Sequence, residues 1–138
     1  MGILSNDPNP VGAKKKRILL VDDDKELRGV LGIRLQKAGY DTITADDGAT
    51  AFELARLKKP DLIILDVMLP KMDGPDVKLA LEDDPETRNI PVVFLTALRQ
   101  KKEEDHLGHQ LGDSIVFAKP VESDRLIQAI EKLTKAAA

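Results

Sequence analysis

Four short apolar runs in this chain each lead directly into a polar residue, and this arrangement restricts the fold more than any other feature. The runs are rich in leucine and β-branched residues without polar alternation, which is typical of strands buried on both faces of a parallel sheet. In open parallel sheets, ligands bind beyond the carboxyl ends of the strands. The sequence therefore predicts that the polar residues surround one crevice. The runs and the residues that follow them are Ile18–Val21 with Asp22 and Asp23, Leu62–Leu65 with Asp66, Val92–Leu95 with Thr96, and Ile115–Ala118 with Lys119.

The segments between the runs carry signals for a further strand and for helices. Residues 40–45 alternate weakly and suit an edge strand. Apolar periodicity, with Pro60 as a stop and Pro75 as a first helical residue, predicts five helices, of which the fourth (99–110) is polar nearly all round. Five βα units with right-handed crossovers predict an α/β fold, a flavodoxin-like doubly wound sheet of five parallel strands in the order 2-1-3-4-5. The apolar residues assigned to helices one, two and five are Leu27, Val30, Leu31, Leu35 and Ala38; Ala51, Phe52 and Ala55; and Leu126, Ile127, Ile130 and Leu133, after Ser123 as a cap.

Length and composition fit one domain. The 138 residues are 42% hydrophobic, which is enough for a single core. Residues 1–15 hold two Asx-Pro pairs and little apolar content, so we expect a flexible tail there and one domain over 16–138. A net charge of -3 argues against nucleic acid as a partner, and no apolar stretch approaches the roughly 20 residues of a membrane helix. Without cysteine the chain fits a reducing compartment, and we expect a cytoplasmic protein.

The predicted strand order brings the polar strand ends next to one another. Strands one, three, four and five are consecutive neighbours, so Asp66 lies between the pair Asp22–Asp23 and Thr96. Neighbouring strands are about 4.8 Å apart, which puts Lys119 two strands, or roughly 10 Å, from Asp66. A four-carbon side chain that leans inward closes that gap, and the acidic cluster attracts its ammonium group. We therefore expect all of these side chains in one site.

Three crowded carboxylates require a cation among them, because like charges about 4 Å apart cost on the order of 4 kcal/mol per pair at an effective dielectric constant of about 20. Oxygen ligands without nearby histidine or cysteine suit Mg²⁺, and Mn²⁺ could substitute. The carboxylate on the middle strand, Asp66, is then best placed to attack phosphorus and form an aspartyl phosphate. Lys119 would neutralise charge on the phosphoryl group, and the Thr96 hydroxyl would donate to one of its oxygens.

The same residues belong to longer motifs, which are Ile18–Asp24, Pro60–Pro70 with Met72–Gly74, Pro91–Ala97 and Lys119–Pro120. In this order and spacing, residues 16 to about 135 resemble the receiver domains of two-component response regulators, in the style of the single-domain chemotaxis regulator. The resemblance implies that Asp66 accepts a phosphoryl group from a histidine kinase or a phosphotransfer protein. It also implies that Mg²⁺ is held by Asp22, Asp23, Asp66 and the backbone carbonyl of Met68.

The resemblance further implies how such a protein would signal. The chain would be a switch rather than an enzyme, one that assists its own phosphorylation and slow dephosphorylation, as a monomer or a weak phosphorylation-dependent dimer. The peptide bond between Lys119 and Pro120 would be cis. The output surface would comprise the fourth helix, fifth strand and fifth helix, roughly residues 98–135, and would bind a downstream protein target.

Three positions depart from the family pattern. Val116 stands where many relatives carry an aromatic residue that moves with the threonine, which bears on how the output is read. Met68 and Leu98, two residues after Asp66 and Thr96, are apolar and cannot orient a hydrolytic water as a carboxylate or an amide would. The sequence therefore predicts a long-lived phosphoryl group.

Two functions from other classes share parts of this pattern. A Mg²⁺-dependent phosphohydrolase with an aspartyl nucleophile would share the fold and the acidic cluster, but it would need a second carboxylate where Met68 stands. A flavodoxin-like module that binds a nucleotide or flavin would need a glycine-rich phosphate loop where Asp22–Asp24 would repel the anion. The sequence leaves open whether the chain is a single-domain regulator or a receiver cut from a longer protein.

Overall fold

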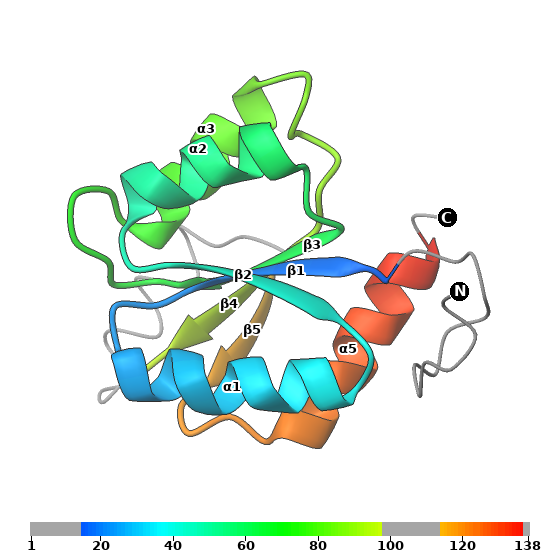
Figure 1. Ribbon diagram of the computed structural model, residues 1–138. Helices are drawn as coiled ribbons and strands as arrows, with labels where there is room; N and C mark the ends of the chain where they lie inside the picture. The colour runs from blue at the N-terminus through cyan, green and yellow to red at the C-terminus, as the bar shows by residue number, and fades with distance from the viewer. Residues whose placement is uncertain (1–14, 98–113, 137–138) are drawn as a thin grey trace, which may run out of the picture.

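A computed structural model describes residues 15–97 and 114–136 of the chain. In chain order, its elements are β1 (Arg17–Val21), α1 (Lys25–Lys37), β2 (Asp41–Ala45), α2 (Gly48–Lys58), β3 (Leu62–Asp66), α3 (Gly74–Asp83), β4 (Val92–Thr96), β5 (Ile115–Ala118) and α5 (Ser123–Ala136). The strands form one parallel sheet in the predicted order, β2-β1-β3-β4-β5. Figure 1 shows α2 and α3 on one face of this sheet and α1 and α5 on the other. The predicted fold class is therefore confirmed.

Alternate residues of the central strands point to opposite faces and divide the core into two layers. In β1, Leu19 and Val21 face α2 and α3, whereas Ile18 and Leu20 face α1 and α5. The same alternation continues through β3 and β4. Because each of these strands is buried on both sides, its sequence is a continuous apolar run rather than an alternating one.

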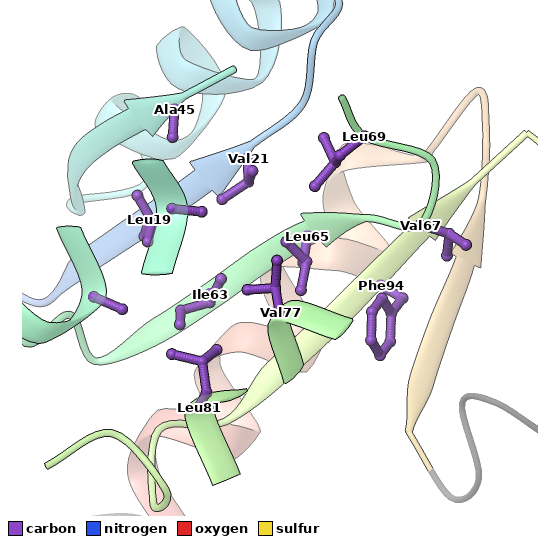
Figure 2. Close-up of a cluster of buried hydrophobic side chains, with 12 residues drawn as sticks. Leu19, Val21, Ala45, Ile63, Leu65, Val67, Leu69, Val77, Leu81 and Phe94 are labelled. Atoms are coloured by element: carbon purple, nitrogen blue, oxygen red, sulfur yellow. The ribbon is translucent and has the colours of Figure 1, made fainter. Parts of the chain in front are cut away.

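The layer beneath α2 and α3 is drawn in Figure 2. Val77 and Leu81 of α3 point toward the sheet, where Ile63 and Leu65 of β3 lie, with Phe94 of β4 beside them. All five side chains are 1% exposed or less. Burying a side chain of this size stabilises the fold by roughly 1.5–3 kcal/mol, so this layer fixes α3 firmly on the sheet.

The opposite layer confirms part of the predicted helix faces and corrects two residues, of which Ala38 is exposed and follows the end of α1. Leu31 and Leu35 of α1, and Leu126 and Ile130 of α5, are at most 2% exposed. The assignment of Val30 to the buried face of α1 was wrong, because 57% of its surface is exposed. Successive helical residues are rotated by about 100°, so the rotation that buries Leu31 and Leu35 turns Val30 toward solvent.

Aspartate side chains begin two of the helices. Asp24 caps α1, and its Oδ1 accepts a hydrogen bond from the Glu26 amide at 3.0 Å. Asp47 caps α2 and accepts from the Thr50 amide at 2.8 Å. Ser123 was predicted to cap the last helix from outside, but it is the first residue of α5 itself. The loops that follow β1 and β2 are thus held at the helix starts.

The last strand differs from the other apolar runs. Ile115 and Val116 of β5 are each 40% exposed, although the pattern predicted burial on both faces. These two side chains are exposed because β5 is an edge strand of the described sheet and pairs there with β4 alone. Continuous apolar sequence therefore marks central strands and this edge strand alike.

Two predicted segments cannot be compared with the structure. The fourth helix (99–110) lies outside the described residues, as does the tail except for its last residue. Neither described stretch of the chain contains a helix with the length and apolarity needed to cross a membrane.

Gly29 lies inside α1 and provides a test of helix stability. A methyl group added there would meet no atom within 4 Å beyond the local helix backbone. Glycine in a helix interior costs about 1 kcal/mol relative to alanine. We therefore expect Gly29→Ala to increase the free energy of unfolding by about 0.5–1 kcal/mol, as measured by urea denaturation. A decrease would contradict the open surroundings of this position.

Candidate functional site

The carboxyl ends of the strands meet at one edge of the sheet, toward the left of Figure 1. Val21 of β1 pairs with Leu65 of β3. The residues that follow them, Asp22 and Asp66, are therefore neighbours across the two strands. The predicted convergence of strand ends is thus present in the structure.

Asp22 is fully buried, and every polar group it carries has a partner nearby. Its backbone amide donates to the Ala45 carbonyl at 3.2 Å, and its own carbonyl accepts from the Arg28 guanidinium at 2.6 Å. Its Oδ1 accepts from the Asp24 amide at 2.9 Å. Its Oδ2 has no hydrogen-bond partner among the described residues but lies 2.7 Å from Lys119 Nζ in an ion pair. The buried carboxylate is thus held by a backbone amide through one oxygen and by the Lys119 ammonium through the other.

Lys119 extends from the end of β5 into the acidic cluster, as predicted. Its Nζ lies 2.7 Å from Asp22 Oδ2 and donates a hydrogen bond to Asp66 Oδ2 at 3.0 Å. Its amide donates to the Thr96 carbonyl at 2.8 Å, and its bond to Pro120 is cis, which the resemblance implied. Burial by itself lowers the pKa of Lys119, but the two carboxylates outweigh burial and raise the pKa above its ordinary value. The side chain is therefore a stable cation.

Asp66 ends the central strand, and only 4% of its surface is exposed. Its Oδ1 accepts from the Met68 amide at 3.3 Å, while Oδ2 accepts from Lys119. Burial raises the pKa of Asp66 to about 6; the Lys119 hydrogen bond opposes this increase, and the charge of Asp22 adds to it. The ionised form of Asp66 therefore depends on a neighbouring cation.

The three aspartates form an acidic cluster that fits a divalent cation. One carboxylate oxygen from each of Asp22, Asp23 and Asp66 lies within 4.8 Å of the others. Asp23 is exposed and the other two are buried, so the cluster is open to solvent on one side. All donors are oxygens, which suits Mg²⁺ or Mn²⁺ better than a soft metal. Asp22 and Asp66 share the single ammonium of Lys119, and this sharing and the raised pKa of Asp66 both fit a site with too little positive charge.

Two glycines allow helices to begin directly against the loop that follows β3. A Cβ atom at Gly74, the first residue of α3, would lie 2.4 Å from the carbonyl oxygen of Asp66. A Cβ atom at Gly48, the first residue of α2, would lie 1.9 Å from the carbonyl oxygen of Met72. The Gly74 amide also donates to the Val67 carbonyl at 2.9 Å. A larger residue at Gly74 would displace the backbone of Asp66, and one at Gly48 would displace the backbone of Met72 in the loop that follows β3.

The remaining predicted site residues occupy the expected places. Thr96 ends β4, beside the end of β5, and is 3% exposed. Met68 directs its amide to Asp66, while 69% of its surface is exposed. Leu98 lies outside the described residues. The structure thus brings together Asp22, Asp23, Asp66 and Lys119, with Thr96 at the same edge of the sheet.

Two residues that contact the backbone of the site have no clear signal in the sequence. Arg28 lies six positions after the aspartate whose carbonyl it binds, and nothing in its spacing distinguishes it from a solvated helical arginine. Gly48 follows the capping residue Asp47, where glycine is an unremarkable first helical residue. The first contact depends on the local path of the β1–α1 turn, and the second joins segments that only the folded chain brings together.

The comparison with protein families agrees with this geometry. The family model described as the response regulator receiver domain matches residues 18–131, which include the whole acidic cluster and Lys119. This chain belongs to the response regulator receiver domain family. It is thus a receiver domain of two-component phosphorelay signalling, and the resemblance seen in the sequence is confirmed.

Curated relatives carry the same domain in proteins of different length. The receiver domain is 41% identical over 119 residues to the response regulator PleD of Caulobacter vibrioides, which covers 86% of this chain and 26% of PleD. It is 34% identical over 116 residues to the polar-differentiation response regulator DivK of Brucella anthropi, which covers 84% of this chain and 94% of DivK. The chain therefore spans about a quarter of one relative and nearly all of another.

Solved structures of receiver domains share the fold. The receiver domain of the sensor histidine kinase PA1611 from Pseudomonas aeruginosa, which has a magnesium ion coordinated in its active site cleft, aligns with a TM-score of 0.79 at 28% identity. This alignment covers 88% of the present chain and 99% of that one. The chemotaxis protein CheY4 of Vibrio cholerae aligns with a TM-score of 0.75 at 28% identity, covering 87% and 99% of the two chains.

Proposed function

We propose that this receiver domain is a phosphorylation-activated switch in which Asp66 accepts a phosphoryl group from a histidine kinase or a phosphotransfer protein. The observation that carries the proposal is the setting of Asp66. It is a buried carboxylate at the end of the central strand, beside the buried Asp22 and hydrogen-bonded to the Lys119 ammonium. Membership in the receiver domain family supports the same role.

In the proposed reaction, a carboxylate oxygen of Asp66 attacks phosphorus. The P–N bond of a phosphohistidine donor breaks, its electron pair stays on the imidazole nitrogen, and a P–O bond to Asp66 forms. Lys119, already within 3.0 Å of the acceptor carboxylate, would neutralise part of the charge of the phosphoryl oxygens. Thr96, at the end of the adjacent strand, would donate its hydroxyl to one of those oxygens. The protein would thus act mainly by positioning the reacting groups and by neutralising the charge of the phosphoryl oxygens.

We further propose that the acidic cluster is a Mg²⁺ site, with Mn²⁺ as a substitute. The ion would neutralise the charge shared by the carboxylates and the phosphoryl group when bound. The close approach of three carboxylate oxygens supports this assignment, as does the magnesium ion in the PA1611 receiver domain. The ligands would be Asp22, Asp23, Asp66 and the backbone carbonyl of Met68.

Acetyl phosphate provides a direct test of the proposed function. The intact protein is incubated with acetyl phosphate and Mg²⁺, and its mass is then measured. We expect a gain of one phosphoryl group per chain, and none when the metal is removed with a chelator. A protein whose mass stays unchanged in the presence of both reagents would overturn the proposal.

The phosphohydrolase alternative makes a different prediction for the same site. It would turn over a phosphomonoester many times, which requires a group that activates water beside Asp66. Met68 occupies the expected place of that group and directs a thioether side chain toward solvent. This observation favours the switch over the hydrolase, and a stop at one phosphate per chain would support the same choice.

The exposed side chain of Met68 also predicts slow loss of the phosphoryl group. A thioether cannot orient a water molecule for attack on phosphorus, whereas an amide can. We expect Met68→Asn to accelerate dephosphorylation by about 10-fold, within the range that a positioned polar group contributes to proton transfer and water activation. Decay would be followed by intact mass after removal of excess acetyl phosphate, with Leu79→Asn on α3, 66% exposed in the wild type, as the control. Loss within seconds from the wild-type protein would contradict the prediction.

The signalling output is proposed to involve β5, α5 and the segment before them. Ile115 and Val116 are partly exposed on the edge strand, which is compatible with a phosphorylation-dependent protein contact. Residues 98–113 of that surface lie outside the described structure. A downstream protein target, a monomer or weak phosphorylation-dependent dimer, a cytoplasmic location and domain limits of 16–138 remain predictions.

A further inference from the structure

We propose that Arg28 is a positioning residue, which holds the β1–α1 turn so that Asp22 and Asp23 present their carboxylates to a divalent cation. The inference rests on the proposed function of the acidic cluster. It begins from the contact between the Arg28 guanidinium and the main-chain carbonyl of Asp22 at 2.6 Å. This contact joins α1 to the first acidic residue of the site.

The Asp22 carbonyl needs such a donor because it lies where the strand ladder ends. Val21 is the last residue of β1, and Asp22 itself is fully buried. A buried carbonyl without a donor costs about 1–3 kcal/mol, so a fixed donor is required at this point. Arg28 supplies it with a charged hydrogen bond, which is stronger than a neutral one.

Arg28 also closes a ring of hydrogen bonds around Asp23. Its backbone amide donates to the Asp24 carbonyl at 3.0 Å, while its side chain binds the Asp22 carbonyl. The Asp24 amide in turn donates to Asp22 Oδ1 at 2.9 Å. The backbone is therefore fixed on both sides of Asp23, which is itself exposed. Without Arg28, the peptide group between Asp22 and Asp23 would be free to rotate. Both carboxylates would then lose the orientation that binding a divalent cation requires.

Charge and position have opposite effects on metal binding, which makes the inference testable. A guanidinium that acted only as a nearby positive charge would repel Mg²⁺, and removing it would tighten binding. A guanidinium that positions the ligands has the reverse effect, because removing residues that orient metal ligands typically weakens affinity by about 10- to 100-fold. The sign of the change therefore separates the two roles.

The experiment measures Mg²⁺ affinity by isothermal titration calorimetry in the absence of any phosphoryl donor. We expect Arg28→Met to weaken binding by about 10-fold or more, and Arg28→Lys to weaken it several-fold, because the lysine keeps the charge but has a shorter reach and loses the planar guanidinium. Arg34→Met, an exposed position on the same helix, is the matched control and should stay within about two-fold of wild type. Affinity in Arg28→Met equal to or tighter than wild type would overturn the proposal.

A second measurement separates local positioning from general stability. Amide hydrogen exchange should accelerate at Asp24, whose amide binds Asp22 Oδ1, and stay unchanged at Ile64 in the core of β3. Faster exchange throughout the sheet would instead show a purely structural role and overturn the inference.

If Arg28→Met does not fold, Arg28→Lys gives both comparisons, and wild-type behaviour in that variant would overturn the proposal. A wild-type chain that does not bind Mg²⁺ would overturn the proposed function itself, whereas equal binding by wild type and both variants would overturn only the role of Arg28.

Discussion

Asp66→Asn is expected to abolish phosphorylation by acetyl phosphate, so that the intact mass no longer increases at any time of incubation. The amide lacks the anionic oxygen that attacks phosphorus, and no other buried carboxylate lies on the central strand. Among the described residues, Asp22 is the nearest buried carboxylate, but its oxygens are held by Asp24 and Lys119. A full phosphoryl gain in Asp66→Asn would assign the acceptor to another residue.

The same substitution should stabilise the metal-free protein. Burial raises the pKa of Asp66 to about 6, so near neutral pH the fold carries an ionised group that its surroundings disfavour. Replacing the carboxylate with a neutral amide removes this cost, and we expect the melting temperature without metal to rise on the order of 5 °C. Asp76→Asn, an exposed position in the first turn of α3, is the matched control: it should leave phosphorylation unchanged and should not raise the melting temperature, because a carboxylate in the first turn favours the helix.

Gly74→Ala is expected to impair both stability and phosphorylation. The added Cβ would lie 2.4 Å from the Asp66 carbonyl oxygen, which is a backbone atom of a central strand and cannot simply rotate away. Overpacking of this kind typically costs about 1–3 kcal/mol, and urea denaturation would measure the loss. Because a displacement of about 1 Å at a reacting group can lower rates by as much as 100-fold, we also expect phosphorylation by acetyl phosphate to slow by about 10-fold or more.

Gly29→Ala is the matched control for this glycine, since it adds the same methyl group in open surroundings. It should be phosphorylated at the wild-type rate and be slightly more stable, whereas Gly74→Ala should be slower and less stable. Wild-type phosphorylation in a correctly folded Gly74→Ala would show that the backbone of Asp66 tolerates displacement, which would contradict the close packing at the start of α3.

The sequence predicts the central part of this site because chain pattern and sheet geometry are directly linked. Continuous apolar runs specify central parallel strands, and the order of such strands then specifies which strand ends are neighbours. The proximity of Asp22 and Asp66 follows from this geometry alone. The contact of Lys119 follows from the length of its side chain and the charge of its partners, and the observed distances of 2.7 Å and 3.0 Å agree with it.

Other features could not be predicted because they depend on packing between segments distant in sequence. Val30 fits the apolar periodicity of α1, but the rotation of the helix is decided by the layer formed with α5. The close approach of Gly48 to the Met72 carbonyl requires the path of a whole loop. The local sequence pattern specifies helices and strands, whereas the contacts between them can be seen only in the folded chain.

The ammonium group of Lys119 already lies between the two buried carboxylates of the site, Asp22 and Asp66. This single positive charge compensates the acidic pair only in part before any divalent ion binds. An arriving cation must share these oxygens with a tethered competitor that cannot diffuse away. The affinity for the metal should accordingly be moderate and its binding reversible. The site would then exchange its ion with the surrounding solution rather than hold it permanently.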